Sequence, residues 1–270
     1  MTDLNDPTSP VFLEKDGAIG RLVLNRPDKR NAMSEAMWSS IPLAVAQLDA
    51  DPDVRVIIVC SSSDKAFSAG ADIAELEQIA GSPERQESNR QAIRDAQRTL
   101  ALAKKPTIAQ VSGACMGGGC GIAIHCDMRF ATNTARFGIT PAKLGLIYPL
   151  NDTKQLMDLV GPAKAKSMLF TGRVVDAEEA LRIGLVDELF PQEELAERTQ
   201  SFAQQMAQVS QYSVRGIKQI IRLILDGQHD DDGVTAKMFK DAHSASDAAE
   251  GVRAFLEKRS PAFRWNGETD

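Results

Sequence analysis

Length, composition and charge exclude several classes of protein. The chain has 270 residues, of which 43% are hydrophobic and 25% charged, and its net charge is −6. These values fit an ordinary globular protein with a sizeable core. No cluster of Lys and Arg suggests nucleic-acid binding, no apolar run is long enough to cross a bilayer, and the acidic, polar N-terminus does not resemble a signal peptide. We therefore expect a cytoplasmic protein that binds neither nucleic acid nor membrane.

The first predicted elements are a loose polar arm and a β-hairpin. The arm covers residues 1–10. Two apolar runs, at 11–13 and 19–24, flank Asp16–Gly17, a dipeptide typical of tight hairpin turns.

A helix and a buried strand follow the hairpin. Ser34 is a suitable helix N-cap, and apolar residues recur at helical spacing from Met37 to Leu48. The run at 54–60 is β-branched and almost wholly apolar, which predicts a strand buried on both faces.

The middle of the chain alternates between strands, turns of small residues and helices. The sequence predicts a turn at 67–72, a helix at 73–79, a mobile loop at 82–97 leading into a helix that ends near 104–106, a strand at 107–111, a glycine-dense turn at 112–121, a short helix at 122–126 and a strand at 128–131. Since strand, turn and helix follow one another at least twice, we predict the α/β class. From Leu195 onward the chain is predicted to be mostly helical.

The four cysteines argue against a metal site or a disulfide framework. They form no CxxC pair and match no zinc spacing. Each lies in an apolar or glycine-rich stretch, which predicts reduced, mostly buried thiols. The cysteines are Cys60, Cys115, Cys120 and Cys126.

Two of the predicted turns could bind an anion through their backbone. FSAGAD (67–72) and GACMGGGCG (113–121) both follow a predicted strand and precede a predicted helix. Glycine lets a backbone approach a ligand closely, and the first N–H groups of a helix lack internal partners, so they can donate to a developing oxyanion. Tight packing of strand on helix is the alternative explanation for either turn alone, since neither fits a dinucleotide or Walker spacing.

Several segments together resemble the crotonase, or enoyl-CoA hydratase/isomerase, family. They are LNRPDKRNAMS (24–34), AFSAGADI (66–73), GACMGGGC (113–120), FTGRVVDAEEALRIGLVDELF (170–190) and GVRAFLEKRSPAF (251–263). The resemblance covers nearly the whole chain. It implies a crotonase-like spiral of ββα turns with an acyl-CoA site over residues 1–195. A C-terminal helical trimerisation region over 196–270 would follow, giving a homotrimer or a dimer of trimers.

The resemblance also implies a site for an acyl-CoA thioester. The N–H groups of Ala71 and Gly118 are expected to form an oxyanion hole for the thioester carbonyl. Lys29 and Arg30 either pair with the phosphates of coenzyme A or form a solvated turn. No metal is expected, and no cofactor, because coenzyme A is part of the substrate. The residues expected along coenzyme A are Arg30, Asn31, Ala32, Ala69, Asp72 and Ile73.

The chain departs from the family where hydration needs carboxylates. Crotonases that hydrate use two glutamates to activate water and to protonate the α-carbon. The matching positions here are Gly121 and Pro141. Neither residue can move a proton, so the two-carboxylate mechanism is not expected, and a single-base isomerase would lack the second glutamate.

Tyr148 is the first candidate to replace the glutamates. It ends the stretch TPAKLGLIY, which in part resembles methylmalonyl-CoA decarboxylase-like members of the family, and a phenol can donate a proton. The alternative is a core or interface tyrosine whose hydroxyl is satisfied. Asp152 is expected to cap a helix, His125 to be a packed core histidine, and Glu75 to face solvent rather than the acyl pocket.

Three functions stay open. The leading one is an acyl-CoA enzyme that passes through a thioester enolate. Decarboxylation tolerates the missing glutamates best, because loss of CO₂ supplies the electrons without a base. The others are a divergent enoyl-CoA hydratase or isomerase, and a non-catalytic acyl-CoA-binding homologue.

Overall fold

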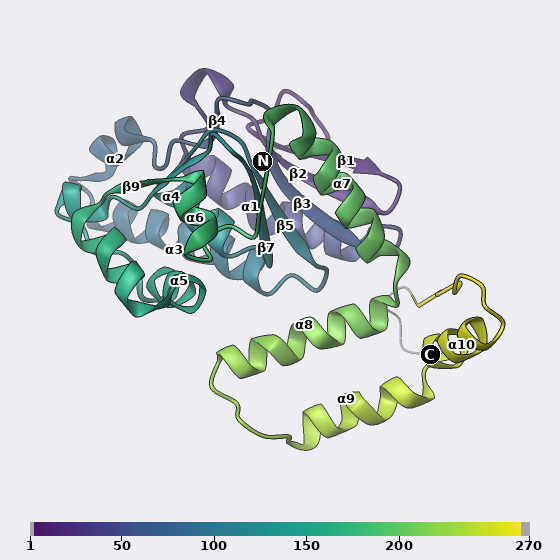
Figure 1. Ribbon diagram of the computed structural model, residues 1–270. Helices are drawn as coiled ribbons and strands as arrows, with labels where there is room; N and C mark the ends of the chain where they lie inside the picture. The colour runs from purple at the N-terminus through teal and green to yellow at the C-terminus, as the bar shows by residue number, and fades with distance from the viewer. Residues whose placement is uncertain (1–2, 266–270) are drawn as a thin grey trace.

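Two β-sheets form the centre of the molecule (Figure 1). The structure is a computed structural model that describes residues 3–265. Within these residues a six-stranded sheet has the order β1-β2-β3-β5-β7-β10, and a four-stranded sheet has the order β4-β6-β8-β9. The strands are β1 (Val11–Asp16), β2 (Ile19–Leu24), β3 (Val56–Ser61), β4 (Ala66–Ser68), β5 (Thr107–Val111), β6 (Ala114–Met116), β7 (Met128–Thr132), β8 (Arg136–Gly138), β9 (Val174–Asp176) and β10 (Glu188–Phe190).

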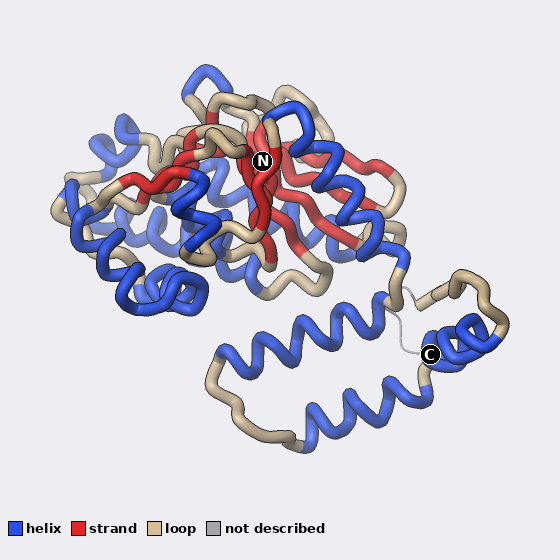
Figure 2. The backbone as a smooth tube through the Cα atoms, in the orientation of Figure 1, coloured by secondary structure: helices blue, strands red, loops and turns tan. Residues whose placement is uncertain are grey.

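Helices surround these sheets and continue beyond them (Figure 2). They are η1 (Pro27–Lys29), α1 (Glu35–Ala50), α2 (Ile73–Ile79), α3 (Pro83–Ala101), α4 (Gly118–Ile124), η2 (Pro141–Leu144), α5 (Leu150–Thr171), α6 (Ala177–Arg182), α7 (Gln192–Gln208), α8 (Gln211–Leu225), α9 (Gly233–Ser244) and α10 (Ser246–Leu256). Over residues 3–265, none of them is both long and apolar enough to cross a bilayer.

Successive turns of the chain give one strand to each sheet. β3, β5 and β7 join the larger sheet, β4, β6 and β8 join the smaller one, and a helix follows each pair. This is the predicted spiral of ββα turns, and the predicted α/β class is confirmed. Because β4 and β6 are parallel neighbours, the turns that follow them lie at the same edge of the small sheet.

The larger sheet is buried on both faces. Along β3, Ile57 and Val59 belong to the core shared with α1, while Val56, Ile58 and Cys60 belong to a second core that includes apolar residues of α7. Side chains alternate between the faces of a strand, so the uninterrupted apolar run of β3 fills both cores.

The predicted hairpin is confirmed, but the predicted loose arm is wrong. β1 and β2 pair antiparallel around the Asp16–Gly17 turn. Ahead of them, Leu4 is buried and its carbonyl accepts a hydrogen bond from the N–H of Leu13 at 2.8 Å. The side-chain amide of Asn25 donates to the carbonyls of Pro7 and Ser9, each at 3.0 Å. Residues 3–10 are therefore held against the hairpin, while the first two residues of the predicted arm lie outside the described residues.

The predicted mobile loop at 82–97 is also wrong. These residues belong to α3, whose N-cap is Ser82 with its hydroxyl accepting from the N–H of Arg85. Only a narrow apolar stripe, with Ala96 and Leu100 buried, faces α1 and the core. Most of the remaining positions are polar or charged, which obscured the helical spacing of the apolar residues.

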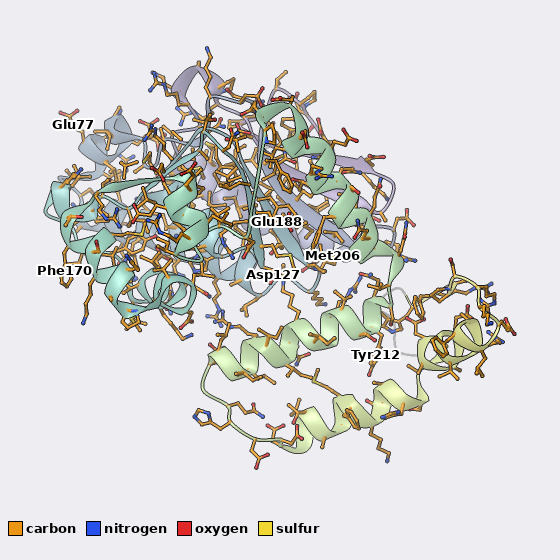
Figure 3. The ribbon with its side chains drawn as sticks, viewed as in Figure 1. Glu77, Asp127, Phe170, Glu188, Met206 and Tyr212 are labelled. Atoms are coloured by element: carbon orange, nitrogen blue, oxygen red, sulfur yellow. The ribbon has the colours of Figure 1, made fainter. Side chains whose placement is uncertain are left out.

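The last three helices extend from the α/β body (Figure 1), and α8 contacts the body through Lys218, whose Nζ donates to Oδ2 of Asp127 at 2.7 Å. α7 packs on the larger sheet through Leu195, Ala203 and Ala207. The chain leaves the body between Met206, at the end of α7, and Tyr212, at the start of α8 (Figure 3). The predicted division after residue 195 thus falls inside α7, and the helices that extend away begin with α8.

Candidate active site

The two glycine-containing turns lie against each other. The first joins β4 to α2 and the second joins β6 to α4. Gly70 and Gly117 both have positive φ, of 97° and 47°, a conformation that glycine adopts without steric cost. A Cβ at Gly117 would lie 3.7 Å from the Cα of Gly70, and one at Gly70 would lie 3.1 Å from the carbonyl oxygen of Met116. A side chain at Gly70 would crowd the second turn, whereas one at Gly117 would only touch the first turn and is disfavoured by the positive φ.

The two N–H groups expected to hold a carbonyl oxygen are unpartnered. Over residues 3–265, neither the N–H of Ala71 nor that of Gly118 donates to a protein acceptor. The β-bridge between Met33 and Ala71 is formed by the backbone groups on either side of Ala71. The N–H of Met33 donates to the carbonyl of Gly70 at 2.7 Å, and the N–H of Asp72 donates to the carbonyl of Met33 at 3.0 Å. Gly118 is the first residue of α4, which begins four residues earlier than predicted, so its N–H is free for that reason.

A small cavity adjoins this place. Its volume is about 20 Å³, and it is lined by Ala71, Trp38 and Glu75, among others. The Trp38 ring also packs on Gly118, where a Cβ would lie only 2.7 Å from Cζ2. The cavity holds about one water molecule. An acyl chain would therefore require α2 and α3, which line it, to move apart.

Glu75 is not simply a solvent-facing residue, so that prediction is wrong. It is half-buried in the wall of this cavity. Its Oε2 accepts a hydrogen bond from the N–H of Glu35 at 2.8 Å, which satisfies one of the open N–H groups at the start of α1. One carboxylate thus lies within the cavity that also contains Ala71.

The residues expected along coenzyme A come together on one side of the turns. Asn31 is fully buried, with its Nδ2 donating to Ser61 Oγ at 2.7 Å and to the Phe67 carbonyl at 3.1 Å. Its Oδ1 accepts from the N–H of Arg26 at 2.6 Å. Asn31 therefore fastens the loop that carries Arg30 and Ala32 to the end of β4.

Exposed and half-buried residues lie around Asn31. The N–H of Ala69 donates to the carbonyl of Arg30 at 2.9 Å. The guanidinium of Arg26 donates to the Ala32 carbonyl at 2.7 Å and to Asp72 at 3.0 Å. Asp72 caps α2, and next to it Ile73 is 61% exposed. Whether coenzyme A binds here stays a prediction.

The position of the first missing glutamate is filled by other side chains. A Cβ at Gly121 would lie 2.4 Å from Nε2 of Gln97 and 3.7 Å from the hydroxyl of Tyr148. That hydroxyl is buried and has no hydrogen-bond partner among the described residues. Within this chain the hydroxyl is therefore not satisfied as in a packed core tyrosine, and the alternative of an interface tyrosine stays a prediction. Pro141, at the second position, starts the short helix η2.

Asp152 does not cap a helix, so that prediction is wrong as well. α5 begins at Leu150 after an N-cap at Pro149, which places Asp152 inside the first turn. Asp152 is only 2% exposed, and its Oδ2 accepts from Nε2 of Gln97 at 3.0 Å. Gln97 thus lies between Asp152 and the position of a side chain at Gly121.

The prediction of a packed histidine at 125 is confirmed. Nδ1 of His125 lies 2.7 Å from the carbonyl oxygen of Gly121, and Nε2 lies 3.6 Å from Oδ1 of Asp152. A carbonyl only accepts, so Nδ1 carries the hydrogen. Burial lowers the pKa of His125 to about 4 and raises the pKa of Asp152 to about 6.

Burial also keeps the other candidate groups protonated. It raises the pKa of Tyr148 well above its ordinary value, and the charge of Asp152 raises it further. All four cysteines are buried and free, as predicted. Burial raises the pKa of Cys60 to about 11 and that of Cys126 to about 12. A nucleophilic thiolate is therefore not favoured at these two positions.

Comparison with known proteins decides the family. The family described as enoyl-CoA hydratase/isomerase matches residues 14–266 of this chain. The chain belongs to the enoyl-CoA hydratase/isomerase family. Family members are enzymes acting on acyl-CoA substrates, and the resemblance that the sequence motifs indicated is confirmed.

Several family members are similar over almost their whole length. Crotonyl-CoA hydratase of Syntrophomonas wolfei is 35% identical over 258 residues, covering 94% of this chain and 97% of the relative. Short-chain-enoyl-CoA hydratase of Clostridium acetobutylicum is 34% identical, covering 92% and 95%. The crystal structure of an enoyl-CoA hydratase/isomerase family protein from Hyphomonas neptunium has a TM-score of 0.93 at 40% identity, covering 95% and 98%.

Sequence reasoning missed one polar residue near the family's first glutamate position. Gln97 fell within the segment predicted as a mobile loop, yet it is only 4% exposed and contacts Asp152. The signal that could have found it is the spacing of Ile93, Ala96 and Leu100, which marks one face of a helix.

Proposed function

We propose that this family member is an acyl-CoA decarboxylase that stabilises a thioester enolate with the N–H groups of Ala71 and Gly118. The observation that supports it is that both N–H groups are unpartnered and lie on turns that contact each other. Two fixed donors in a closed site stabilise a developing oxyanion far better than water does, because they need no reorganisation.

Decarboxylation suits the residues at the family's two glutamate positions. When the bond between the α-carbon and a carboxylate breaks, its electron pair forms the enolate and CO₂ leaves. The enolate then takes a proton at the α-carbon, and the phenol of Tyr148 is the proposed donor. Gly121 and Pro141 need supply neither base nor acid in this sequence.

Coenzyme A would lie along the residues that surround the first turn. Arg30 and Ala32 would follow its chain, and Ala69, Asp72 and the exposed Ile73 would meet its adenine. An apolar side chain that is 61% exposed beside backbone groups suits a flat aromatic ring. Coenzyme A would be part of the substrate, with no further cofactor.

A second candidate is an unusual hydratase or isomerase in which Glu75 moves the proton. Glu75 lines the cavity that contains Ala71, and relatives over 30% identical are described as hydratases. Replacing Glu75 with Gln distinguishes the two. A hydratase or isomerase would lose turnover of an enoyl-CoA, whereas the decarboxylase would keep its turnover within a few-fold.

The activity test offers malonyl-type and crotonyl-type CoA esters to the purified protein. CO₂ release and the absorbance of the enoyl thioester are followed in parallel. Release of CO₂ without a change in enoyl absorbance supports decarboxylation. Tight binding of both esters, measured by calorimetry, with turnover of neither would instead support the non-catalytic homologue.

The oxyanion hole has its own test, with a matched control. Gly118→Pro removes the N–H, and Gly118→Ala keeps it while adding a similar clash with Trp38. The two variants therefore differ chiefly in one hydrogen-bond donor. Loss of this donor is expected to lower kcat by about 10²–10³ relative to Gly118→Ala. Equal rates in the two variants would remove the role of Gly118.

We further propose that the chain assembles through α8, α9 and α10 as a homotrimer or a dimer of trimers. Large apolar side chains on these helices are exposed, including Ile224 at 59%, Phe239 at 70% and Phe255 at 82%. Exposed apolar area on this scale is typical of a contact surface. Light scattering after size-exclusion chromatography tests the proposal, and a monomer at micromolar concentration would contradict it.

A further inference from the structure

We propose that Asp152 is a positioning residue whose charge controls how readily the Tyr148 hydroxyl releases its proton. The inference rests on the proposed function in one respect, because it concerns the proton that the enolate receives. It concerns a group placed by α5, not by the turn on which the family's first glutamate would stand.

The burial of Asp152 is the first observation. The residue is 2% exposed, Gln97 Nε2 donates to its Oδ2, and Oδ1 has no partner within hydrogen-bond distance among the described residues. A carboxylate in such surroundings is unfavourable unless it is well paired. Groups of this kind concentrate at functional sites.

The orientation of His125 is the second observation. Its Nδ1 donates to the carbonyl of Gly121, so Nε2 of the neutral ring presents a lone pair to Oδ1 of Asp152, 3.6 Å away. Two acceptors face each other unless one proton lies between them. Asp152 therefore gains a partner when it becomes protonated, and its negative charge is then lost.

The location of Tyr148 is the third observation. Its hydroxyl and the amide of Gln97 both lie within 4 Å of the point where a Cβ of Gly121 would stand. The hydroxyl is buried and unpartnered, and the charge of Asp152 acts on it. Ionised Asp152 opposes the loss of the phenol proton, since phenolate would be a second negative charge. Neutral Asp152 removes that opposition.

Other titratable groups act on the same cluster. Cys115 and Cys120 also act on Tyr148, and burial raises the pKa of Cys115 well above its ordinary value. Arg222 of α8 also acts on His125 and disfavours its protonated form. Asp152 is thus the carboxylate of this cluster, and its ionisation changes the charge beside Tyr148.

The proposed step is the transfer of a proton from the Tyr148 hydroxyl to the enolate. The O–H bond of Tyr148 breaks as a C–H bond forms at the α-carbon of the enolate, whose electron pair makes that bond. The phenolate then takes a proton from solvent. Asp152 transfers nothing to the substrate in this scheme and acts through its charge alone.

A spectroscopic titration tests the coupling without any substrate. The chain has two tyrosines, so Tyr212→Phe leaves Tyr148 as the only phenol. The absorbance of phenolate is then followed with rising pH in this background, with and without Asp152→Asn. We expect the amide to lower the titration midpoint by about one pH unit, the effect of one like charge nearby. An unchanged midpoint would overturn the proposal.

The pH dependence of turnover is the second test and needs no variant. In the natural chain, kcat for CO₂ release from a malonyl-type CoA is expected to rise about three-fold as pH falls through about 6. Asp152→Asn should give the higher rate at every pH, and Asp152→Glu should restore the pH dependence. If Asp152 only tied α5 to α3, the amide variant would keep the profile of the natural chain, and the proposal would fail.

The two tests separate the inference from the proposed function. A lowered tyrosine midpoint in a protein that turns over no acyl-CoA would reject the decarboxylase and leave the coupling standing. CO₂ release with an unchanged midpoint and an unchanged pH profile would reject the coupling alone.

Discussion

Replacing Asp152 with Asn is expected to stabilise the protein at neutral pH. Burial raises the pKa of this carboxyl from its ordinary 3.8 to about 6. A group whose pKa is raised in the folded state favours folding at low pH, and this contribution is lost as the pH rises through about 6. At pH 7.5 the folded chain therefore holds a buried carboxylate that the unfolded chain would leave in water.

The size of the effect follows from the two pKa values. Each unit of pKa corresponds to about 1.4 kcal/mol, so the difference between 3.8 and about 6 sets an upper limit of about 3 kcal/mol. The amide keeps the acceptor for Gln97, so the hydrogen bond to α3 survives the replacement. Asp152→Asn should therefore be more stable than the natural chain by up to about 3 kcal/mol at pH 7.5, and the gap should close towards pH 4.

Urea unfolding followed by circular dichroism, at one protein concentration and at several pH values, measures this gap. Fixed concentration matters because association of copies would also raise the apparent stability. Asp64→Asn, on an exposed turn, is the matched control and should give a gap near zero throughout. The explanation would be refuted if the difference in free energy of unfolding between Asp152→Asn and the natural chain did not change with pH. It would also be refuted if the natural chain were the more stable of the two at pH 7.5.

Three further predictions concern the supports of the site. Asn31→Ala should lower the free energy of unfolding by about 2–3 kcal/mol in urea titrations, because it leaves the buried Phe67 carbonyl without its donor; a loss below 0.5 kcal/mol would count against this. Arg26→Ala frees Asp72 and the loop beside it, so KM for an acyl-CoA should rise several-fold while kcat changes little; a fall in kcat alone would contradict it. The four buried cysteines should resist a thiol reagent in native buffer and all react in denaturant; rapid reaction of any one in native buffer would show that it is accessible.

Elements whose apolar residues follow one clear period were predictable from the sequence. The hairpin, β3 and α2 appear where expected, because alternation, β-branched runs and turn dipeptides are local signals. A helix ending near 104–106 was expected, but most of α3 was predicted as a loop because its buried stripe is narrow and most of its surface is charged. The N-terminal arm was missed because its contacts, such as Leu13 with Leu4, are backbone bonds that composition does not reveal.

The turns of the site were predictable, and the cluster behind them was not. FSAGAD and GACMGGGCG are recognisable because small residues lie between a predicted strand and a predicted helix. Asp152 resembled an N-cap because Thr153 and a helical pattern follow it, but the N-cap of α5 is Pro149, three residues earlier. Gln97 and Asp152 are 55 residues apart in sequence. Their contact depends on how α3 and α5 pack, which one sequence does not specify.

Packing relates the absence of a carboxylate at position 121 to the presence of one at position 152, because Gln97 lies beside both. Any side chain at Gly121 would place its Cβ 2.4 Å from the amide nitrogen of Gln97, much closer than atoms can approach. That nitrogen is the far end of a flexible side chain, so Gln97 would have to shift, and its hydrogen bond to the almost fully buried Asp152 would be disturbed. A glutamate at 121 would therefore compete with the Gln97–Asp152 pair for the same space. The chain carries a buried carboxyl on α5 rather than on the turn, and in the proposed scheme the charge of that carboxyl acts on the acyl site through Tyr148.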